Sequence, residues 1–110
     1  MTDQHQKLLV ILDQITQELK RKALWQDSPP SPEALASTQP FCVDTLTFAE
    51  WTQWIMIPRF GVMVHQGHPL PNQSDIFSMA EEALKLVSQD TQKLEALFLE
   101  LDNCLRNTVH

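Results

Sequence analysis

The seven prolines constrain the fold of this 110-residue chain more than any other residue type. A proline inside a helix removes a backbone hydrogen bond and its ring clashes with the preceding turn, so helices must stop or bend where prolines occur. Four prolines lie within residues 26–46, two follow residue 68, and Pro58 stands alone in an apolar segment. Long helices are therefore expected before residue 26 and after residue 46, interrupted near Pro58 and residue 69.

Apolar side chains recur at spacings of three and four residues in three segments, Leu8 to Leu19, 76–87 and Leu94 to Leu105. That spacing places them on one face of a helix, so each segment is predicted to be an amphipathic helix. Whether the second and third helices are separate or continuous near Ser88–Thr91 stays open. The sequence has no sustained period-two alternation and no hairpin dipeptide, so strands are not expected.

A further helix is predicted from Thr47 to about Gln66. Thr47 and Glu50 have the spacing of a capping box, in which each side chain accepts a hydrogen bond from the other residue's backbone N–H. Pro58 removes one backbone hydrogen bond, so a kink or break is expected near residues 54–58. Because apolar residues occur on nearly all sides of this helix, it is predicted to be a buried centre that the other helices surround.

These segments predict an all-α fold, a small bundle of about four long helices forming one domain over residues 1–110. Residues 26–46, called the proline strap below, are expected to form a loop after the first helix, with one short helical turn capped by Ser31. Ser74 is expected to cap the helix that starts after it. Asp102 is expected to lie on the solvated face of the last helix.

The charge distribution disfavours binding to nucleic acids and to anionic membranes. The net charge is -6, and from Ala23 to Leu84 the one basic residue, Arg59, stands against seven acids. Affinity for nucleic acid comes largely from lysines and arginines that neutralise phosphates. The longest apolar run, Leu8 to Leu12, is far shorter than the roughly 18 residues of a membrane span. No signal peptide is visible, so a cytoplasmic protein with reduced thiols is expected.

The stretch from Ser37 to Phe60 gathers the most unusual residues of the chain and is the predicted location of any binding site. Residues 41–44 alternate between apolar and other side chains, and which of their two sides is buried stays open. The candidate binding patch comprises Phe41, Cys42, Asp44, Trp51, Trp54 and Arg59.

Arg59 has two interpretations, because an arginine on a buried helix must find a partner. In the first its partner is structural: an acid, for which the candidates are Asp44, Glu50, Glu81 and Glu82, or the backbone carbonyl that Pro58 leaves free. In the second its planar guanidinium group lies beside the tryptophan rings and binds an anion.

The sequence predicts no catalytic residue, no cofactor and no metal site, and the chain is not expected to be an enzyme. A nucleophilic cysteine needs a base and a positive environment, whereas Cys42 has Asp44 nearby. His65 and His68 have a spacing that metal ligands use, but Gly67 lies between them and ends the helix.

The motifs of the middle region resemble those of the YqcC-like family of small bacterial proteins, also called domain of unknown function 446. The matching residues are Ser37–Cys42, Asp44, Thr45, Glu50, Trp51, Gln53–Ile55, Ile57–Arg59 and Pro69–Pro71. The resemblance implies an all-helical fold and brings no catalytic residues, because the activity of the family is not established. It also implies an association, through gene neighbourhood, with a tRNA pseudouridine synthase.

The chain is therefore expected to be a small accessory protein that binds another protein, or a second copy of itself as a homodimer. Tryptophan, methionine and arginine, which protein interfaces favour, support this expectation. The first alternative is a protein that binds a small anion or carboxylate in a pocket of tryptophan and arginine. The second alternative, suggested by the resemblance alone, is an indirect accessory to a tRNA pseudouridine synthase.

Overall fold

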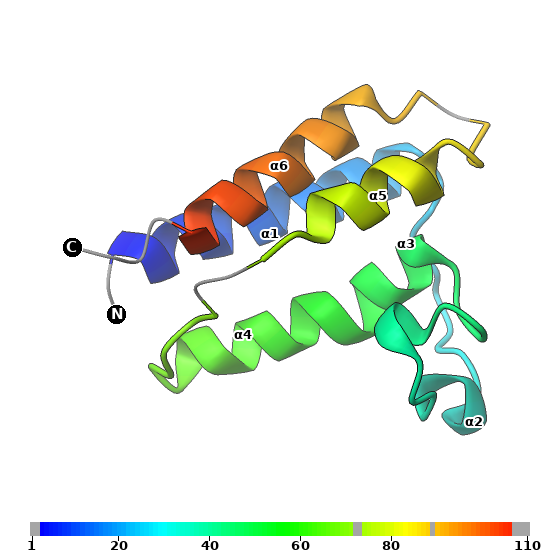
Figure 1. Cartoon of the computed structure of the whole chain (residues 1–110), viewed down its shortest axis with the longest axis horizontal. Coiled ribbons are helices and arrows are strands. Elements are labelled where there is room, and N and C mark those ends of the chain that lie inside the picture. The colour runs from blue at the N-terminus through cyan, green and yellow to red at the C-terminus, as the bar shows by residue number, and fades with distance from the viewer. Residues whose placement is uncertain (1–2, 72–73, 89, 107–110) are drawn as a thin grey trace.

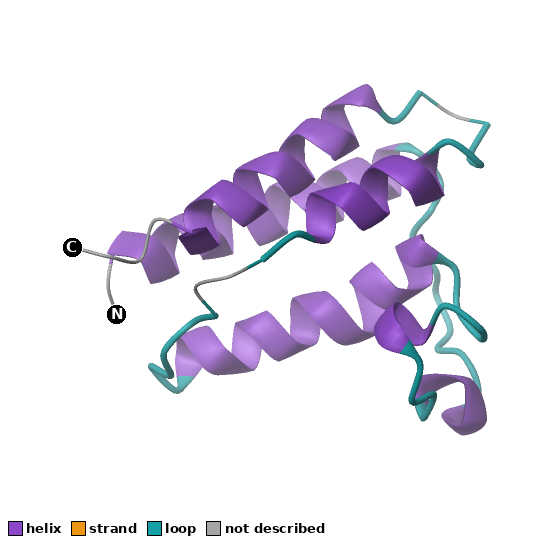
Figure 2. Cartoon of the chain, in the orientation of Figure 1, coloured by secondary structure: helices purple, strands orange, loops and turns teal. Residues whose placement is uncertain are grey.

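The computed structural model describes residues 3–71, 74–88 and 90–106, and every regular element in this part of the chain is helical (Figure 2). The all-α prediction is therefore confirmed. The elements in chain order are α1 (Asp3–Arg21), α2 (Pro32–Leu35), the 3-10 turn η1 (Pro40–Cys42), α3 (Phe48–Trp51), the π-helical turn η2 (Thr52–Met56), α4 (Ile57–His65), α5 (Ile76–Leu84) and α6 (Gln92–Arg106).

Each long helix runs antiparallel to the one before it in the chain (Figure 1). α6 packs against both α1 and α5, and the continuous helix formed by α3, η2 and α4, called the middle helix below, lies beneath them. Side chains from Phe98, Leu101 and Leu105 of α6 are completely buried, so the core lies along this helix. The start of α1 meets the end of α6, where the Gln4 side chain donates to the Cys104 carbonyl at 3.1 Å.

None of the described helices combines the length and the apolar character that crossing a membrane would require.

The helix boundaries near the strap agree with their predicted caps. The Thr47 hydroxyl accepts a hydrogen bond from the Glu50 backbone at 3.1 Å, and the Glu50 carboxylate accepts one from the Thr47 backbone at 2.8 Å. Ser31 caps α2 through a hydrogen bond from the Ala34 backbone at 3.1 Å. At the other end of the middle helix Gly67 has φ 67°, the left-handed conformation that ends many helices.

Pro58 is accommodated by a π-helical turn and does not break the helix. The backbone N–H of Ile57 donates to the carbonyl of Thr52, five residues back, and the flanking residues keep right-handed helical dihedral angles. Pro58 then occupies the first turn of α4, where its missing N–H is tolerated. The predicted interruption near residues 54–58 is thus a local widening of the helix, of the kind often found at functional sites.

The middle helix is less enclosed than its composition suggests, and this part of the expectation is wrong. One face, which carries Trp51, Met56 and Phe60, is buried, whereas Arg59 is exposed and Val62 exposes 53% of its surface. The helix packs against α1 and α5 through limited contacts, so other helices do not surround it.

The predicted start of α5 is also corrected. Asp75, and not Ser74, is the N-cap, and the Ser74 hydroxyl instead donates to the carboxylate of Asp102 at 2.6 Å. α5 ends at Leu84 and α6 begins at Gln92, so the two helices whose separation was left open are distinct.

Candidate binding groove

The strap enters the middle helix through a tight turn in which two non-glycine residues adopt left-handed dihedral angles. Phe41 has φ 57° and Cys42 has φ 50°. The turn is closed by backbone hydrogen bonds from Val43 to Pro40 at 3.1 Å and from Leu46 to Cys42 at 2.8 Å. Such conformations cost energy for residues with a side chain and persist only where the surroundings hold them.

This turn settles which side of residues 41–44 is buried, because a turn does not follow the alternation of an extended strand. Cys42 lies inside with 6% of its surface exposed, whereas Val43 points outward and exposes 57%. Phe41 is half-buried and packs edge-on against Trp51, with ring centroids 4.7 Å apart. Trp51 in turn contacts Phe48, whose ring lies 5.1 Å from Phe98 in the core.

A groove of about 630 Å³ lies between this turn and the C-terminal end of α5. One wall comes from the strap and the start of the middle helix and includes Phe41, Val43 and Phe48. The opposite wall comes from the end of α5 and the turn that follows, and includes Met79, Ala83 and Leu86. Eleven of its thirteen lining residues are apolar, and the only charged one is Glu82. This surface is called the α3–α5 groove below.

Two large apolar side chains stand at the edge of the α3–α5 groove without cover. Leu86, just beyond the end of α5, exposes 89% of its surface, and Val43 faces solvent from the other wall. Single exposed apolar residues are ordinary, but a contiguous apolar patch with a concave shape is typical of an interaction site.

A polar network on the other side of the middle helix holds the strap in place. The Gln53 side chain accepts a hydrogen bond from the Gln26 backbone N–H at 2.8 Å and donates one to the Gln26 carbonyl at 2.7 Å. The Gln26 side chain donates to Glu50 at 3.0 Å and accepts from the Trp54 indole at 2.9 Å. The chain segment that begins with Leu24, which lines the groove, is thereby fixed to the helix.

Hydrogen bonds from Thr47 and from the Gln26 side chain lower the pKa of Glu50. The backbone N–H of Thr47 is the largest cause, partial burial acts in the opposite direction, and the side chains of Gln26 and Thr47 add to the lowering. Each of these donors stabilises the carboxylate more than the neutral acid.

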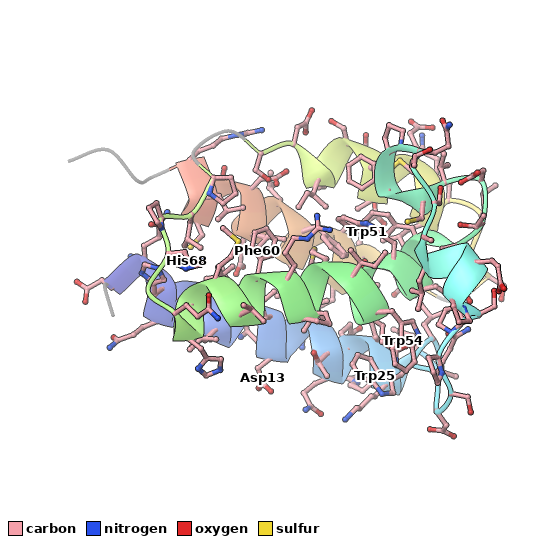
Figure 3. The ribbon with its side chains drawn as sticks, turned by 90° about the horizontal axis from the view of Figure 1, so that it is seen from below. Asp13, Trp25, Trp51, Trp54, Phe60 and His68 are labelled. Carbon is pink, nitrogen blue, oxygen red and sulfur yellow. The ribbon has the colours of Figure 1, made fainter. Side chains whose placement is uncertain are left out.

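The residues of the predicted binding patch do not form one surface. Phe41, Cys42 and Trp51 lie together, whereas Figure 3 shows Trp54 on the opposite side of the helix, near Trp25. Asp44 is exposed and accepts a hydrogen bond from Ser37.

Arg59 is exposed and forms no ion pair within the part of the chain that the structure describes, so its interpretation as a buried ion pair is wrong. A binding role for the patch stays a prediction.

The wall contributed by α5 was not anticipated from the sequence. Leu86 follows the charged Lys85 at the end of a helical pattern, and an apolar residue beyond a helix end is the only local signal for it. Leu86 and Val43 line the same groove because α3 packs against α5, and the spacing of residues in the sequence does not reveal this contact.

A second depression, of about 640 Å³, lies between α1 and α6. Six of its nine lining residues are polar, so it offers less apolar surface than the α3–α5 groove. Cys104 lies in it, and burial raises the pKa of this thiol while the charge of Lys7 acts in the opposite direction, so the protonated form is favoured. Within the described residues, no three histidine, cysteine or acidic side chains are grouped closely enough to hold a metal ion.

Comparison with known proteins identifies relatives over most of the chain. The family model DUF446, described as tRNA pseudouridine synthase C, matches residues 7–104. An uncharacterized protein of Haemophilus influenzae is 38% identical over 86 residues, which are 78% of this chain and 81% of that protein. The uncharacterized protein YqcC of Escherichia coli is 31% identical and covers 87% of this chain and 94% of its own length.

Two further similarities concern the fold and a larger protein. The solution NMR structure of YqcC from E. coli superimposes with a TM-score of 0.84 at 27% identity and covers 99% of this chain and 93% of that one. The tRNA pseudouridine synthase C of Pectobacterium carotovorum is 39% identical over 57 residues, which are 52% of this chain but 15% of that protein.

Proposed function

The chain belongs to the YqcC-like family, domain of unknown function 446, and from this premise we propose that it is an accessory protein that assembles with a tRNA pseudouridine synthase. In this proposal the chain contributes a binding surface, and the synthase contributes the chemistry. The cytoplasm, where tRNA is modified, is then its place of action.

One observation carries the proposal: a protein named tRNA pseudouridine synthase C contains a region similar to this chain within a much longer polypeptide. Covalent linkage of two units makes their contact intramolecular, so a weak interaction between them becomes effective. The same contact between separate chains requires a surface of adequate affinity, and the α3–α5 groove is a suitable surface.

The charges of the chain fit a protein partner of this kind. An enzyme that acts on tRNA needs lysines and arginines to bind the phosphates. The net charge of -6 of this chain is complementary to such a surface and speeds association through electrostatic attraction.

The test is complex formation between the full chain and the tRNA pseudouridine synthase C of the same organism. We expect the two proteins to elute together in size-exclusion chromatography with light scattering, and calorimetry to give a Kd of about 1 µM or lower. Separate elution at a total concentration well above this value contradicts the proposal.

Binding of a small anion is the alternative function, and the exposed guanidinium group of Arg59 supports it. Neither Arg59 nor a tryptophan lines the α3–α5 groove. Titration of the tryptophan fluorescence with a set of carboxylates tests it.

A further inference from the structure

We infer that the α3–α5 groove seats an apolar segment of the synthase that is flanked by basic residues. This inference rests on the proposed function and deepens it, because it assigns the docking surface on this chain and the chemistry of the segment that fills it.

The shape and the lining of the groove favour an inserted apolar segment. Its rings are held by a chain of aromatic contacts that runs from Phe41 through Trp51 to the core, so this wall does not collapse when the groove is empty. Val43 and Leu86 stand on opposite walls and are the most exposed of the large apolar residues that line the groove. An amphipathic helix or a short apolar segment buries such a pair by laying its own apolar side chains between them.

The groove is preorganised, which lowers the cost of binding. The left-handed turn at Phe41 and Cys42 is closed by backbone hydrogen bonds, and the two hydrogen bonds between Gln53 and Gln26 fix the strap on the other side of the helix. Side chains and loops that are already ordered in the free protein lose little conformational entropy when a partner binds.

Charge decides between the synthase and a second copy of this chain as the occupant. Glu82 is the charged residue of the groove lining and forms an exposed ion pair with Lys85 at 3.2 Å, so the negative character comes from the wider surface. The region Ala23 to Leu84 holds seven acids and a single base, and the whole chain has a net charge of -6. Two copies that meet through this surface would bring like charges together, which is unfavourable. A segment from an enzyme that binds tRNA carries basic residues, which are attracted to the same surface.

The experiment measures binding of the full-length synthase to chain variants at the groove edge. Val43→Glu and Leu86→Glu each place a charge where the segment is expected to insert, and both positions are exposed, so the fold tolerates them. We expect each to raise the Kd at least about tenfold. The matched control is Val62→Glu, because Val62 is similarly exposed, at 53% against 57% for Val43, but lies outside the groove lining. This control should change the Kd less than about twofold.

The salt dependence of the Kd tests separately whether basic residues flank the bound segment. Glu82→Lys is expected to raise the Kd for the synthase, because it replaces the acid that pairs with Lys85 by a second base beside the groove. The dependence of the Kd on salt should weaken, since part of the attraction that salt screens is lost. Equal salt dependence of the wild type and this variant contradicts the basic flank.

The outcomes separate this inference from the proposed function. Binding of the wild type together with unchanged Kd values for Val43→Glu and Leu86→Glu overturns the groove assignment and leaves the proposed function standing. Absence of wild-type binding overturns both. If the chain alone is a dimer that Val43→Glu dissociates, while the control Val62→Glu does not, a second copy occupies the groove and the inference is wrong.

Discussion

At the scale of single residues, Asp102 makes the largest difference between the expected and the observed structure. It was expected on a solvated face, yet its side chain is completely buried. Its carboxylate accepts hydrogen bonds from the backbone of Ile76 at 3.0 Å, from the backbone of Phe77 at 2.7 Å and from the Ser74 hydroxyl. A side chain of α6 thus satisfies the free N–H groups at the start of α5, where the helix dipole also favours a negative charge.

Asp102→Ala is expected to lower the free energy of unfolding by about 2–4 kcal/mol, because it leaves buried backbone donors without an acceptor. Urea denaturation of the purified variant measures this value. The control Glu100→Ala removes an exposed acid from the same helix and should change it by less than about 0.5 kcal/mol. Equal stability of the two variants would show that Asp102 does not carry this role.

The position of Asp102 in the sequence already indicates that its side chain lies on the apolar face of α6. It follows Phe98 by four residues, and positions four apart lie on the same face of a helix. A charged residue within an apolar face indicates either an error in the predicted face or a buried polar partner. The partner here is the start of another helix, and only the tertiary structure identifies it.

Glu50 should link stability to pH through its lowered pKa. A lowered pKa in the folded protein means that its contribution is present above the ordinary value of 4.5 and is lost as the pH falls through the folded pKa. Glu50→Gln should therefore be less stable than the wild type at about pH 7, and the difference should shrink as the pH falls to about 3. Urea denaturation at several pH values, with Glu100→Gln as a charge-matched control, measures it. A difference between wild type and Glu50→Gln that stays constant with pH contradicts the linkage.

At the scale of the elements, two of the three predicted helix caps were correct, because such caps act over three or four positions, whereas Ser74 was displaced by Asp75 as the cap of α5. Thr47 with Glu50 and Ser31 with the first turn of α2 behave as their spacing indicates. The left-handed turn at Phe41 and Cys42 was not predictable, since neither residue type favours that conformation. It forms because the Trp51 ring and the burial of Cys42 hold it, and these contacts link segments that are separated along the chain.

The contact between the strap and the middle helix depends on Gln53, which is 4% exposed and bonds to both backbone groups of Gln26. Gln53→Ala is expected to cost about 2–3 kcal/mol of unfolding free energy and to speed amide hydrogen exchange in residues 24–28. Hydrogen exchange with mass spectrometry reads this segment directly. Gln66→Ala changes an exposed glutamine at the end of the same helix and serves as control. Unchanged exchange in residues 24–28 would mean that other contacts hold the strap.

At the scale of the whole molecule, the prolines and the apolar spacing were sufficient for the all-α class, because helices depend on local periodicity. The candidate binding surface was predictable only on one side. Phe41, which lines the groove, and Trp51, which packs against it, belong to the segment singled out from the sequence by its unusual residues. The wall around Leu86 results from the way α5 packs against α3. Arg59 was predicted to be buried because most of its neighbours on the middle helix are apolar, but it is exposed. The sequence of a helix does not reveal which of its sides lacks a covering helix.

Because of its overall negative charge, the chain alone should not bind tRNA. With a net charge of -6 and one base between Ala23 and Leu84, it cannot release enough counterions from the phosphates to gain affinity. A gel-shift assay at low salt, where electrostatic binding is strongest, should show free tRNA at every concentration of the chain, with the synthase as the positive control. A shift by the chain alone that disappears with added salt would show a phosphate-binding surface. In that case a direct contact with tRNA, and not a protein interface, would explain the similarity of this chain to a part of a tRNA pseudouridine synthase C.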